Sequence, residues 1–282
     1  MKKRVLALLM AAMMVFALSA CSGSSSDSSD DSADADTESA DTEEEADEDS
    51  DVAYIQEKGT LIVGITDFEP MDYLDDDGNW IGFDADLAVL LAEDLGVEVE
   101  FVEIDWDNKI LELDNASIDV VWNGMTLTDE VAEAMNCTDA YLNNAQIVVM
   151  AADLIDSYTD TDSLSELTFA VESGSAGEAA AEELGLNYTS VLTQADALME
   201  VASGSSDAAI IDSLMAAAMV GEGTSYEDLT YGLELTTEEY VVGCRVGSDL
   251  TDYINALFET WAQDGTLQEV AETYGVQAAL VE

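Results

Sequence analysis

Basic residues are almost absent from this chain of 282 residues. It contains no histidine and only 6 lysines and arginines against 63 aspartates and glutamates, so its formal charge is −57 at pH 7. The field of such a chain repels other polyanions, which argues against nucleic acid, anionic lipid surfaces and highly phosphorylated ligands as partners. Three of the six bases stand in the opening stretch MKKR. Once that stretch is removed, the remaining bases are Lys58, Lys109 and Arg245.

The missing histidines also exclude several kinds of chemistry. Neither a Ser-His-Asp nor a Cys-His catalytic arrangement can be built, and zinc and copper sites lose their usual ligands. The segment LDDDGNW suggests a calcium loop, but an EF-hand loop with Gly78 at its sixth position would begin at Tyr73, which has no carboxylate. A hairpin turn at Asp77 and Gly78 explains the segment better, since glycine tolerates a positive φ. We therefore expect no metal ion and no other cofactor.

The chain has only three cysteines, and the first of them, Cys21, closes an N-terminal targeting signal. The basic stretch MKKR is followed by the apolar run VLALLMAAMMVFAL and then by LSAC. This pattern predicts a secretory signal peptide over residues 1–20, and it resembles the bacterial lipoprotein signal, in which the cysteine thiol receives the lipid. An uncleaved membrane anchor is the alternative, but the apolar run of roughly 16 residues is shorter than the ~20 that a span needs. We therefore expect a protein that is lipid-anchored to the bacterial cell membrane on its extracytoplasmic side.

The other two cysteines, Cys137 and Cys244, both stand in strand-like sequence. Buried thiols at such positions pack as small apolar groups, so we expect both to be free. A disulfide between them is the alternative, because the extracytoplasmic setting is oxidising.

The segment after Cys21 has no apolar residue larger than alanine. Residues 22–51 contain only Ser, Gly, Asp, Ala, Thr and Glu, with 14 acids and no base. A segment of this composition cannot bury enough apolar surface to offset its ordering entropy, so residues 21–51 are expected to form a disordered acidic tether. The folded body is expected from about Val52 to Glu282.

Apolar runs in the rest of the chain predict an α/β fold. The first runs alternate as strand, helix, strand, helix and strand, which is the order of a parallel sheet. They are TLIVGI, Asp84 to Leu95, VEVEFV, WDNKILELDNAS and IDVVWNGM. The alternation restarts after the apolar strand AQIVVMA and ends at a second apolar strand, EYVVGCRVG.

This restart predicts two lobes, each a mainly parallel sheet flanked by helices, joined by two crossing strands. The chain is expected to leave the first lobe near Gln146 to Met150 and to return near Tyr240 to Arg245. The predicted segments are residues 52–145 for the first part of lobe 1, 146–240 for lobe 2, and 241–282 for the return to lobe 1 and the C-terminal helices.

A glycine-rich turn stands between a strand and a helix in the second lobe. It reads ESGSAGE, residues 172–178. Free N-H groups at the start of such a helix can hold an anion. The turn lacks the lysine of a phosphate-binding loop, and an ordinary turn between the two elements is an equally good interpretation.

Seven segments together resemble a known family, the polar amino acid substrate-binding proteins of ABC importers. The resemblance covers nearly all of Gly59 to Gly275 and is carried by GTLIVGITDFEPMDY, GNWIGFDADLAVLLAEDLGVEVEFV, WDNKILELDNASIDVVWNGMTLTDE, CTDAYLNNAQIVVM, AVESGSAGE, DAAIIDSLMAA and DGTLQEVAETYG. It implies the two-lobed "Venus flytrap" fold of periplasmic binding proteins. It also implies a non-enzymatic, monomeric protein that captures a small polar ligand, most simply an amino acid, and delivers it to an ABC permease.

The resemblance assigns ligand-binding roles to residues of both lobes. Those of the first lobe are Asp67 and Phe68 in the first strand-helix loop, Trp106 as an aromatic wall, and Asn123, Gly124 and Thr126 as hydrogen-bond partners of the ligand's carboxylate. Those of the second lobe are Ser175 and Ala176 at a helix start and Asp212, which takes the α-ammonium group. Core packing is the alternative role for Trp106, and capping of the following helix is compatible with the role of Asp212.

One residue departs from the family pattern. The family has an arginine three residues after the final threonine of this segment, and that arginine grips the α-carboxylate with two hydrogen bonds. Here Thr128 is followed by Asp129, Glu130 and Val131, so valine stands at the arginine position. If the ligand has a carboxylate, we expect neutral donors to replace the arginine. The candidates are the Asn123 side chain, the Thr126 hydroxyl, N-H groups near Gly124 and the helix start at 175–177.

Three other functions remain open. The same fold could bind a cationic amine without a carboxylate, held by Asp212, Asp67 and aromatic faces. An enzyme is a weaker alternative: dehydratases resembling this fold exist, but no acid/base pair can be singled out. A sensor is the third, although the chain offers no transmembrane or cytoplasmic signalling segment.

Overall fold

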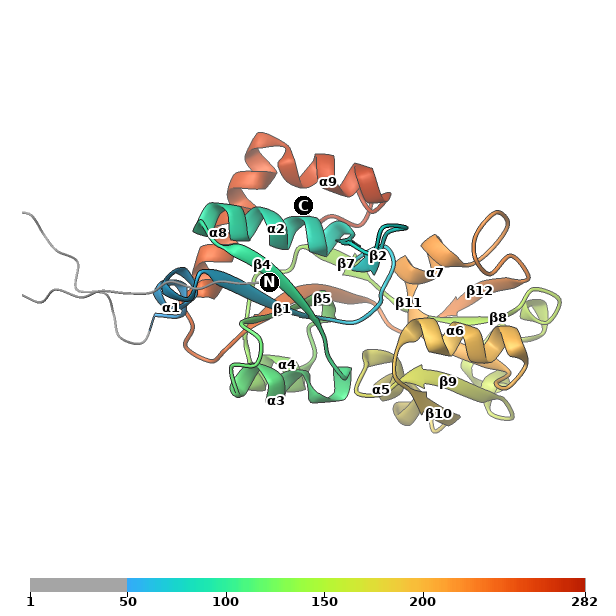
Figure 1. Ribbon diagram of the computed structural model, residues 1–282. Coiled ribbons are helices and arrows are strands. Elements are labelled where there is room, and N and C mark those ends of the chain that lie inside the picture. The colour runs from blue at the N-terminus through green and yellow to red at the C-terminus, as the bar shows by residue number, and fades with distance from the viewer. Residues whose placement is uncertain (1–49, 282) are drawn as a thin grey trace, which may run out of the picture. The chain divides into compact units, whose positions relative to one another are not determined.

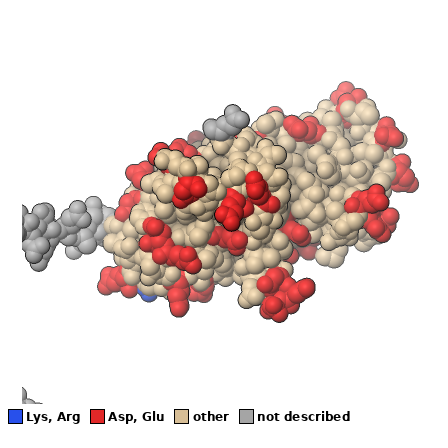
Figure 2. Space-filling model, turned by 90° about the horizontal axis from the view of Figure 1, so that it is seen from above, with Lys and Arg blue, Asp and Glu red and all other residues tan. Residues whose placement is uncertain are grey.

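The computed structural model describes residues 50–281. The expected signal peptide, the lipidated Cys21 and all but the last two residues of the acidic tether lie outside this range. Figure 2 shows aspartate and glutamate side chains spread over one face of the molecule, where basic side chains are scarce. Within residues 50–281 no helix has the length and apolarity that a membrane crossing requires.

The first sheet has six strands. Its order is β4-β1-β5-β13-β6, with β7 also pairing with β13. The central β1 runs parallel to β4 and β5, whereas β13 pairs antiparallel with β5, β6 and β7. The strands are β1 Thr60–Ile65, β4 Glu98–Glu103, β5 Val120–Thr126, β6 Asn136–Cys137, β7 Leu142–Asn144 and β13 Glu238–Cys244.

Helices cover both faces of the first sheet. In Figure 1, α2, α8 and α9 lie above it and α3 and α4 lie below it. The apolar strand residues accordingly divide between two buried clusters, one with α2, α8 and α9 and one with α3 and α4. The helices are α1 Asp51–Lys58, α2 Phe83–Leu95, α3 Lys109–Asp114, α4 Asp129–Ala134, α8 Leu250–Asp264 and α9 Thr266–Tyr274. A short 3-10 helix, η1, spans Trp106–Asn108 and runs into α3.

The second sheet has five strands in the order β10-β9-β11-β8-β12. Strands β10, β9 and β11 are parallel, and β8 and β12 continue the sheet antiparallel. The strands are β8 Gln146–Ala151, β9 Thr168–Glu172, β10 Asn187–Val191, β11 Ala208–Asp212 and β12 Leu229–Glu234. The helices are α5 Ala176–Glu183, α6 Gln194–Ser203 and α7 Ser213–Met219, with 3-10 turns η2 Ile155–Ser157 and η3 Thr161–Leu164. The α/β, two-sheet architecture is as predicted, but each sheet is mixed rather than mainly parallel.

Both chain crossings lie a few residues away from the predicted positions. Strand β8 belongs wholly to the second sheet and β13 wholly to the first, so the chain crosses at Ala145 and returns over residues 235–237. The two crossings run side by side, since the Leu235 N-H donates to the Gln146 carbonyl at 2.8 Å. Strand-like sequence flanks each crossing, but a strand pattern alone does not show with which of the two sheets the strand pairs.

Two further predictions can be compared with the structure. Strands β2 Tyr73–Leu74 and β3 Trp80–Ile81 pair antiparallel, which confirms the hairpin with Gly78 at φ +82° in its turn. Both described cysteines are free, as predicted. Cys137 pairs with Gly243, the neighbour of Cys244, and the two thiols lie in different clusters on opposite faces of the sheet.

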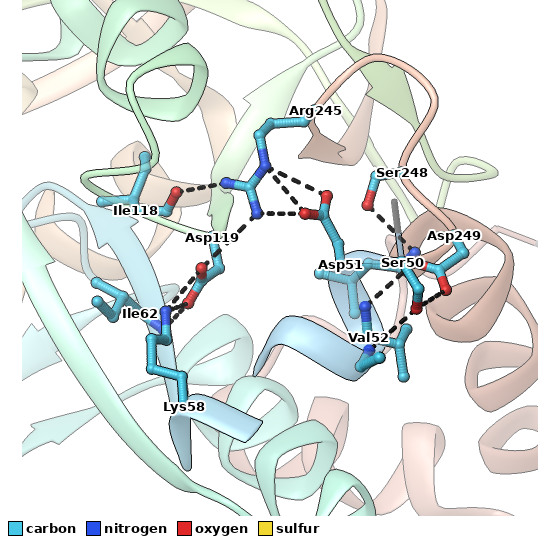
Figure 3. Close-up of polar contacts among 12 residues, drawn as sticks. Ser50, Asp51, Val52, Lys58, Ile62, Ile118, Asp119, Arg245, Ser248 and Asp249 are labelled. Carbon is cyan, nitrogen blue, oxygen red and sulfur yellow. Dashed lines mark hydrogen bonds and ion pairs between the residues drawn. The ribbon is translucent and has the colours of Figure 1, made fainter. Parts of the chain in front are cut away.

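Two of the three basic residues fasten α1 to the first sheet (Figure 3). The Lys58 ammonium lies 2.6 Å from Asp119, whose side chain is fully buried. The Arg245 guanidinium pairs with Asp51 at 2.8 Å and donates to the Ile118 carbonyl at 2.9 Å. These bonds occupy both cations, and neither residue reaches the cavity described next.

Candidate ligand-binding site

A cavity of about 260 Å³ opens between the two sheets, and both sheets contribute to its walls. The structure brings eight of the nine predicted ligand-binding residues to this cavity: Phe68, Trp106, Asn123, Gly124, Thr126, Ser175, Ala176 and Asp212. Asp67 is the exception, because its side chain is exposed and does not line the cavity. The cavity also contains residues that the sequence analysis did not assign, among them Lys109, Gln146, Glu172 and Gln194.

The apolar wall of the first lobe depends on a glycine at the end of β5. Gly124 has φ +54°, and a Cβ atom there would lie 2.6 Å from the Phe68 ring and 3.0 Å from the Tyr240 ring. The two rings meet edge to face with their centroids 6.4 Å apart. Glycine at 124 therefore lets Phe68 reach the cavity and lets Tyr240 pack behind it.

The Asn123 side chain is fully occupied within the protein. Its Oδ1 accepts from the Thr66 N-H at 3.0 Å and from the Thr66 hydroxyl at 2.8 Å. Its Nδ2 donates to the Thr66 carbonyl at 3.0 Å and to Asp72 at 2.7 Å. An asparagine side chain has two donor hydrogens and two acceptor lone pairs, so none is left for a ligand. Asn123 joins β5 to the loop after β1 instead of serving as a donor to the cavity.

The other neutral donors predicted for the first lobe are also occupied. The Gly124 N-H donates to Asp84 at 2.6 Å, and the Thr126 hydroxyl donates to Glu238 at 2.9 Å. Thr128 caps α4 by accepting from the Val131 N-H at 3.2 Å. The expectation that neutral donors of this segment replace the missing arginine is therefore not met in this arrangement.

Val131 itself occupies the wall where an arginine would be expected. It lines the cavity, is 3% exposed and belongs to the same buried cluster as Trp106. The valine side chain makes this part of the wall apolar and cannot donate to an anion.

Asp212 stands at the end of β11 and is held by three amide groups. Its carboxylate accepts from the side-chain N-H groups of Gln146 (2.6 Å), Asn144 and Gln194. The helix α7 starts directly after it, yet the Asp212 side chain makes no capping bond to that helix. The amides fix this carboxylate at the cavity, where one lone pair of Oδ2 remains for a ligand.

Asp212 shares its amide donors with a second carboxylate. Asn144 and Gln146 each also donate to Glu238 at 2.7 Å. Asn144 and Gln146 flank the first crossing and Glu238 directly follows the second, so their hydrogen bonds with Asp212 and with one another connect both crossings to the cavity. Burial, and then the neighbouring Glu238, raise the pKa of Asp212 well above its usual value.

Glu172, at the end of β9, is the second buried carboxyl group in the wall. It is 3% exposed, and its Oε1 has no hydrogen-bond partner among residues 50–281. Burial, followed by the charge of Asp212, raises its pKa to about 8. Glu172 therefore carries a proton for much of its time at neutral pH and gives it up readily beside a cation.

The glycine-rich turn after Glu172 closes on itself. Ser175 caps α5 by accepting from the Glu178 N-H at 3.1 Å, and the Glu178 carboxylate accepts from the Gly174 N-H at 2.8 Å. The bond from the Glu178 N-H to Ser175 is one half of a capping box, but the Glu178 carboxylate bonds to the residue before the cap and not to the cap residue itself. These bonds fix the turn that precedes α5.

Lys109 is the one basic residue among the cavity residues that were not predicted. Its ammonium donates to the Gly174 carbonyl at 2.9 Å and to the Trp106 carbonyl at 3.3 Å, and lies 4.9 Å from the centre of the Trp106 ring. Burial lowers its pKa. The spacing in WDNK could have revealed it, because residues three apart share a helix face and Trp106 was already expected at the wall.

Two carboxyl groups support the cavity from behind. Asp72 and Asp84 are fully buried and hold Asn123 and Gly124 in place. Burial raises the pKa of Asp84 to about 7, and burial together with the charge of Asp84 raises the pKa of Asp72. Folding therefore shifts the protonation equilibrium of both groups toward the protonated form.

These shifts predict that the ligand-free protein loses stability as the pH rises. In the unfolded chain these carboxyl groups are already ionised at pH 6, whereas in the folded protein Asp84 and Glu172 have pKa values of about 7 and about 8 and still hold protons. The folded state therefore binds more protons than the unfolded state, and it loses this advantage as the pH rises through these pKa values. We expect the melting temperature to fall by about 5–10 °C between pH 6 and pH 8, at constant ionic strength. The change should be smaller in Asp84→Asn, and a melting temperature that is level or rises over this interval would contradict the prediction.

The sequence and the fold match known proteins over most of the chain. Residues 61–277 match the bacterial extracellular solute-binding proteins, family 3. The arginine-binding extracellular protein ArtP of Bacillus subtilis (strain 168) is 29% identical over 282 residues, which cover 96% of this chain and 98% of ArtP. The L-cystine-binding protein TcyJ of Escherichia coli (strain K12) is 28% identical over 236 residues, which cover 78% of this chain and 84% of TcyJ.

Solved structures agree with these matches. An ancestral amino acid-binding protein, AncCDT-1, described as a precursor of cyclohexadienyl dehydratase, superposes with a TM-score of 0.73 at 31% identity, covering 80% of this chain and 99% of its own. A histidine-bound substrate-binding protein of an ABC uptake transporter from Streptococcus pneumoniae gives a TM-score of 0.72 at 28% identity, covering 82% of this chain and 98% of its own. The chain belongs to the bacterial extracellular solute-binding proteins, family 3, a family of binding proteins and not of enzymes.

Proposed function

We propose that the protein captures an amino acid in the cavity between its two sheets and presents it, as a monomer, to the permease of an ABC importer. The observation that carries the proposal is the convergence of eight residues, assigned from five separate segments, on one cavity. The arginine-, cystine- and histidine-binding relatives support an amino acid as the ligand. Delivery to a permease follows from the uptake-transporter relative.

Capture takes place by closure of two lobes around the ligand. Lobe 1 is built on the first sheet from residues 52–144 and 238–281, and lobe 2 is built on the second sheet from residues 146–234. A ligand that contacts both lobes stabilises the closed arrangement over the open one, and the paired crossing segments absorb the rotation. The shared amide network of Asn144, Gln146, Asp212 and Glu238 lies at this hinge, so ligand contact with Asp212 acts directly on it.

The charges of the wall favour a ligand with a positive charge. Four acids line the cavity, namely Asp129, Glu130, Glu172 and Asp212, whereas Lys109 is the one basic residue. The rings of Phe68 and Trp106 add faces that attract cations. We therefore expect cationic or neutral amino acids to bind and glutamate and aspartate to bind worse.

A carboxylate-free cationic amine is a second candidate ligand. Two observations favour it: valine stands at the arginine position, and the Asn123, Gly124 and Thr126 donors are already occupied. Thermal-shift screening against amino acids and amines, followed by calorimetry at moderate salt, separates the candidates. Absence of any bound amino acid in both measurements would contradict the proposed function.

We also propose that Cys21 carries a lipid that holds the protein at the outer face of the cell membrane. The signal-like sequence that ends in LSAC supports this proposal. In Cys21→Ala, the protein is expected to leave the membrane fraction while its ligand affinity and melting temperature stay unchanged. Membrane fractionation followed by immunoblotting measures the change. A variant that partitions with membranes as the parent does would contradict the anchor.

A further inference from the structure

The basic residues of the described chain are divided between two tasks. Lys58 and Arg245 are paired with Asp119 and Asp51, away from the cavity. Lys109 alone reaches the cavity wall, in a protein whose described residues are dominated by acids. Lys109 is thus the one described basic residue that a ligand in the cavity can contact.

Lys109 has no counter-ion among the residues that the structure describes. It is 8% exposed, and within residues 50–281 no carboxylate oxygen lies within 4.0 Å of its ammonium. Two of its three N-H groups donate to the Trp106 and Gly174 carbonyls, which leaves the third without a protein acceptor in this part of the chain. A buried ammonium group without a partner is destabilising, so an anion that entered the cavity would relieve the burial of this charge.

The position of Lys109 also links the two sides of the cavity. Lys109 and Trp106 belong to the side of the first sheet, whereas Gly174 lies in the turn between β9 and α5 of the second. The ammonium thus sits where the two sides meet. Asp212 lines the same cavity and, among residues 50–281, makes no hydrogen bond or ion pair with Lys109, so the cavity offers an ammonium group and a carboxyl group that are not paired with each other.

We propose that Lys109 binds the α-carboxylate of the ligand and so performs the role of the arginine that is absent at Val131. Asp212 then receives the α-ammonium group. The inference rests on the proposed function, because it requires an amino acid in this cavity. It differs from the expectation of neutral donors, and it explains how an acidic cavity recognises a carboxylate.

The acids near Lys109 do not serve as its counter-ion in place of the ligand's carboxylate. Asp107, Glu130 and Glu172 lie near enough to act on its charge, but none reaches ion-pair distance. Asp107 and Glu130 are exposed, so water screens them. The pKa of Glu172 is raised to about 8, so this group is largely neutral at pH 7.

Three ligand pairs that differ only in the carboxylate test the inference: L-arginine and agmatine, L-lysine and cadaverine, and L-histidine and histamine. Calorimetry measures the affinity ratio of each amino acid to its amine. We expect the parent protein to prefer at least one amino acid over its amine by about 10- to 100-fold, the range of a charge-assisted hydrogen bond. In Lys109→Met this preference should fall to about threefold or less, and Lys109→Arg should keep most of it.

A matched variant controls for net charge. Gln263→Glu also makes the protein more negative by one charge, on the exposed surface of α8, and should leave the ratio unchanged. Equal weakening of amino acid and amine by Lys109→Met would mean that Lys109 serves only to bridge to Gly174, and would overturn the inference. An unchanged ratio, or a parent protein that prefers the amines, would overturn it as well. If the parent binds no member of any pair, the proposed function fails and the inference fails with it.

Discussion

Replacing Gly174 with alanine is expected to weaken ligand binding by about 10- to 100-fold. Gly174 lies on the second-sheet side of the cavity at φ +70°, and a Cβ atom there would lie 2.7 Å from the Asp107 Cα on the other side. The atom that it would meet belongs to the backbone, so a side-chain movement cannot relieve the clash. Overpacking of this kind typically costs about 1–3 kcal/mol, and here that penalty falls on the arrangement in which the two sides of the cavity approach each other at Gly174 and Asp107.

Gly185 provides the matched control for this substitution. It has a similar φ of +65°, and a Cβ atom there would meet nothing within 4 Å. Gly185→Ala should therefore introduce the backbone strain alone. We expect it to lower the unfolding free energy by about 1 kcal/mol and to leave the ligand affinity unchanged. Calorimetry and thermal melts of both variants separate the two effects. Equal ligand affinities for Gly174→Ala and Gly185→Ala would show that the close approach at Asp107 plays no part in binding.

Removing the charge of Asp212 is expected to lower affinity more than removing the Thr126 hydroxyl. A hydrogen bond that involves a charge contributes roughly 1.5–3 kcal/mol, and a neutral one about 0.5–1.5 kcal/mol. Asp212 faces the cavity, and an ammonium group beside it opposes the rise in its pKa and favours the carboxylate, whereas Thr126 already donates to Glu238. We expect an affinity loss of about 10- to 100-fold for Asp212→Asn and of less than about tenfold for Thr126→Ala.

The asparagine at 212 has a second consequence that must be measured separately. Its amide cannot accept from Asn144, Gln146 and Gln194 at once, so the unfolding free energy should also fall. Titrations are therefore carried out well below the melting temperature of the variant. An Asp212→Asn protein that is folded and binds with unchanged affinity would show that this carboxylate does not hold the ligand.

Local sequence patterns predicted the order of most of the elements, and the family resemblance predicted most of the cavity. The alternation of apolar runs placed β1, β4 and β5, and the resemblance placed residues as distant as Phe68 and Asp212 at one site. The half-exposed edge strand β12 and the six-residue helix α4 escaped prediction, because neither has a strong periodic pattern. The exact chain crossings escaped it because a strand pattern does not show with which sheet the strand pairs.

The availability of donors could not be predicted, because it depends on partners that are distant in the sequence. Asn123 is saturated by Thr66 and Asp72, and the Gly124 N-H by Asp84, at separations of 40 to 57 residues. The direction of the Lys109 side chain depends likewise on Gly174, 65 residues away. A motif identifies which residues reach a site, but it does not show which of their hydrogen-bonding groups remain free there.

Calorimetric titration of the protein with L-arginine, L-histidine and L-glutamate at neutral pH and moderate salt tests the central claim most directly. Four acids and one lysine line the cavity, so L-arginine or L-histidine should bind. L-glutamate should bind more weakly than the basic amino acid that binds. Preferential binding of glutamate, or no heat of binding with any of the three, would contradict an amino acid site built on Asp212 and Lys109.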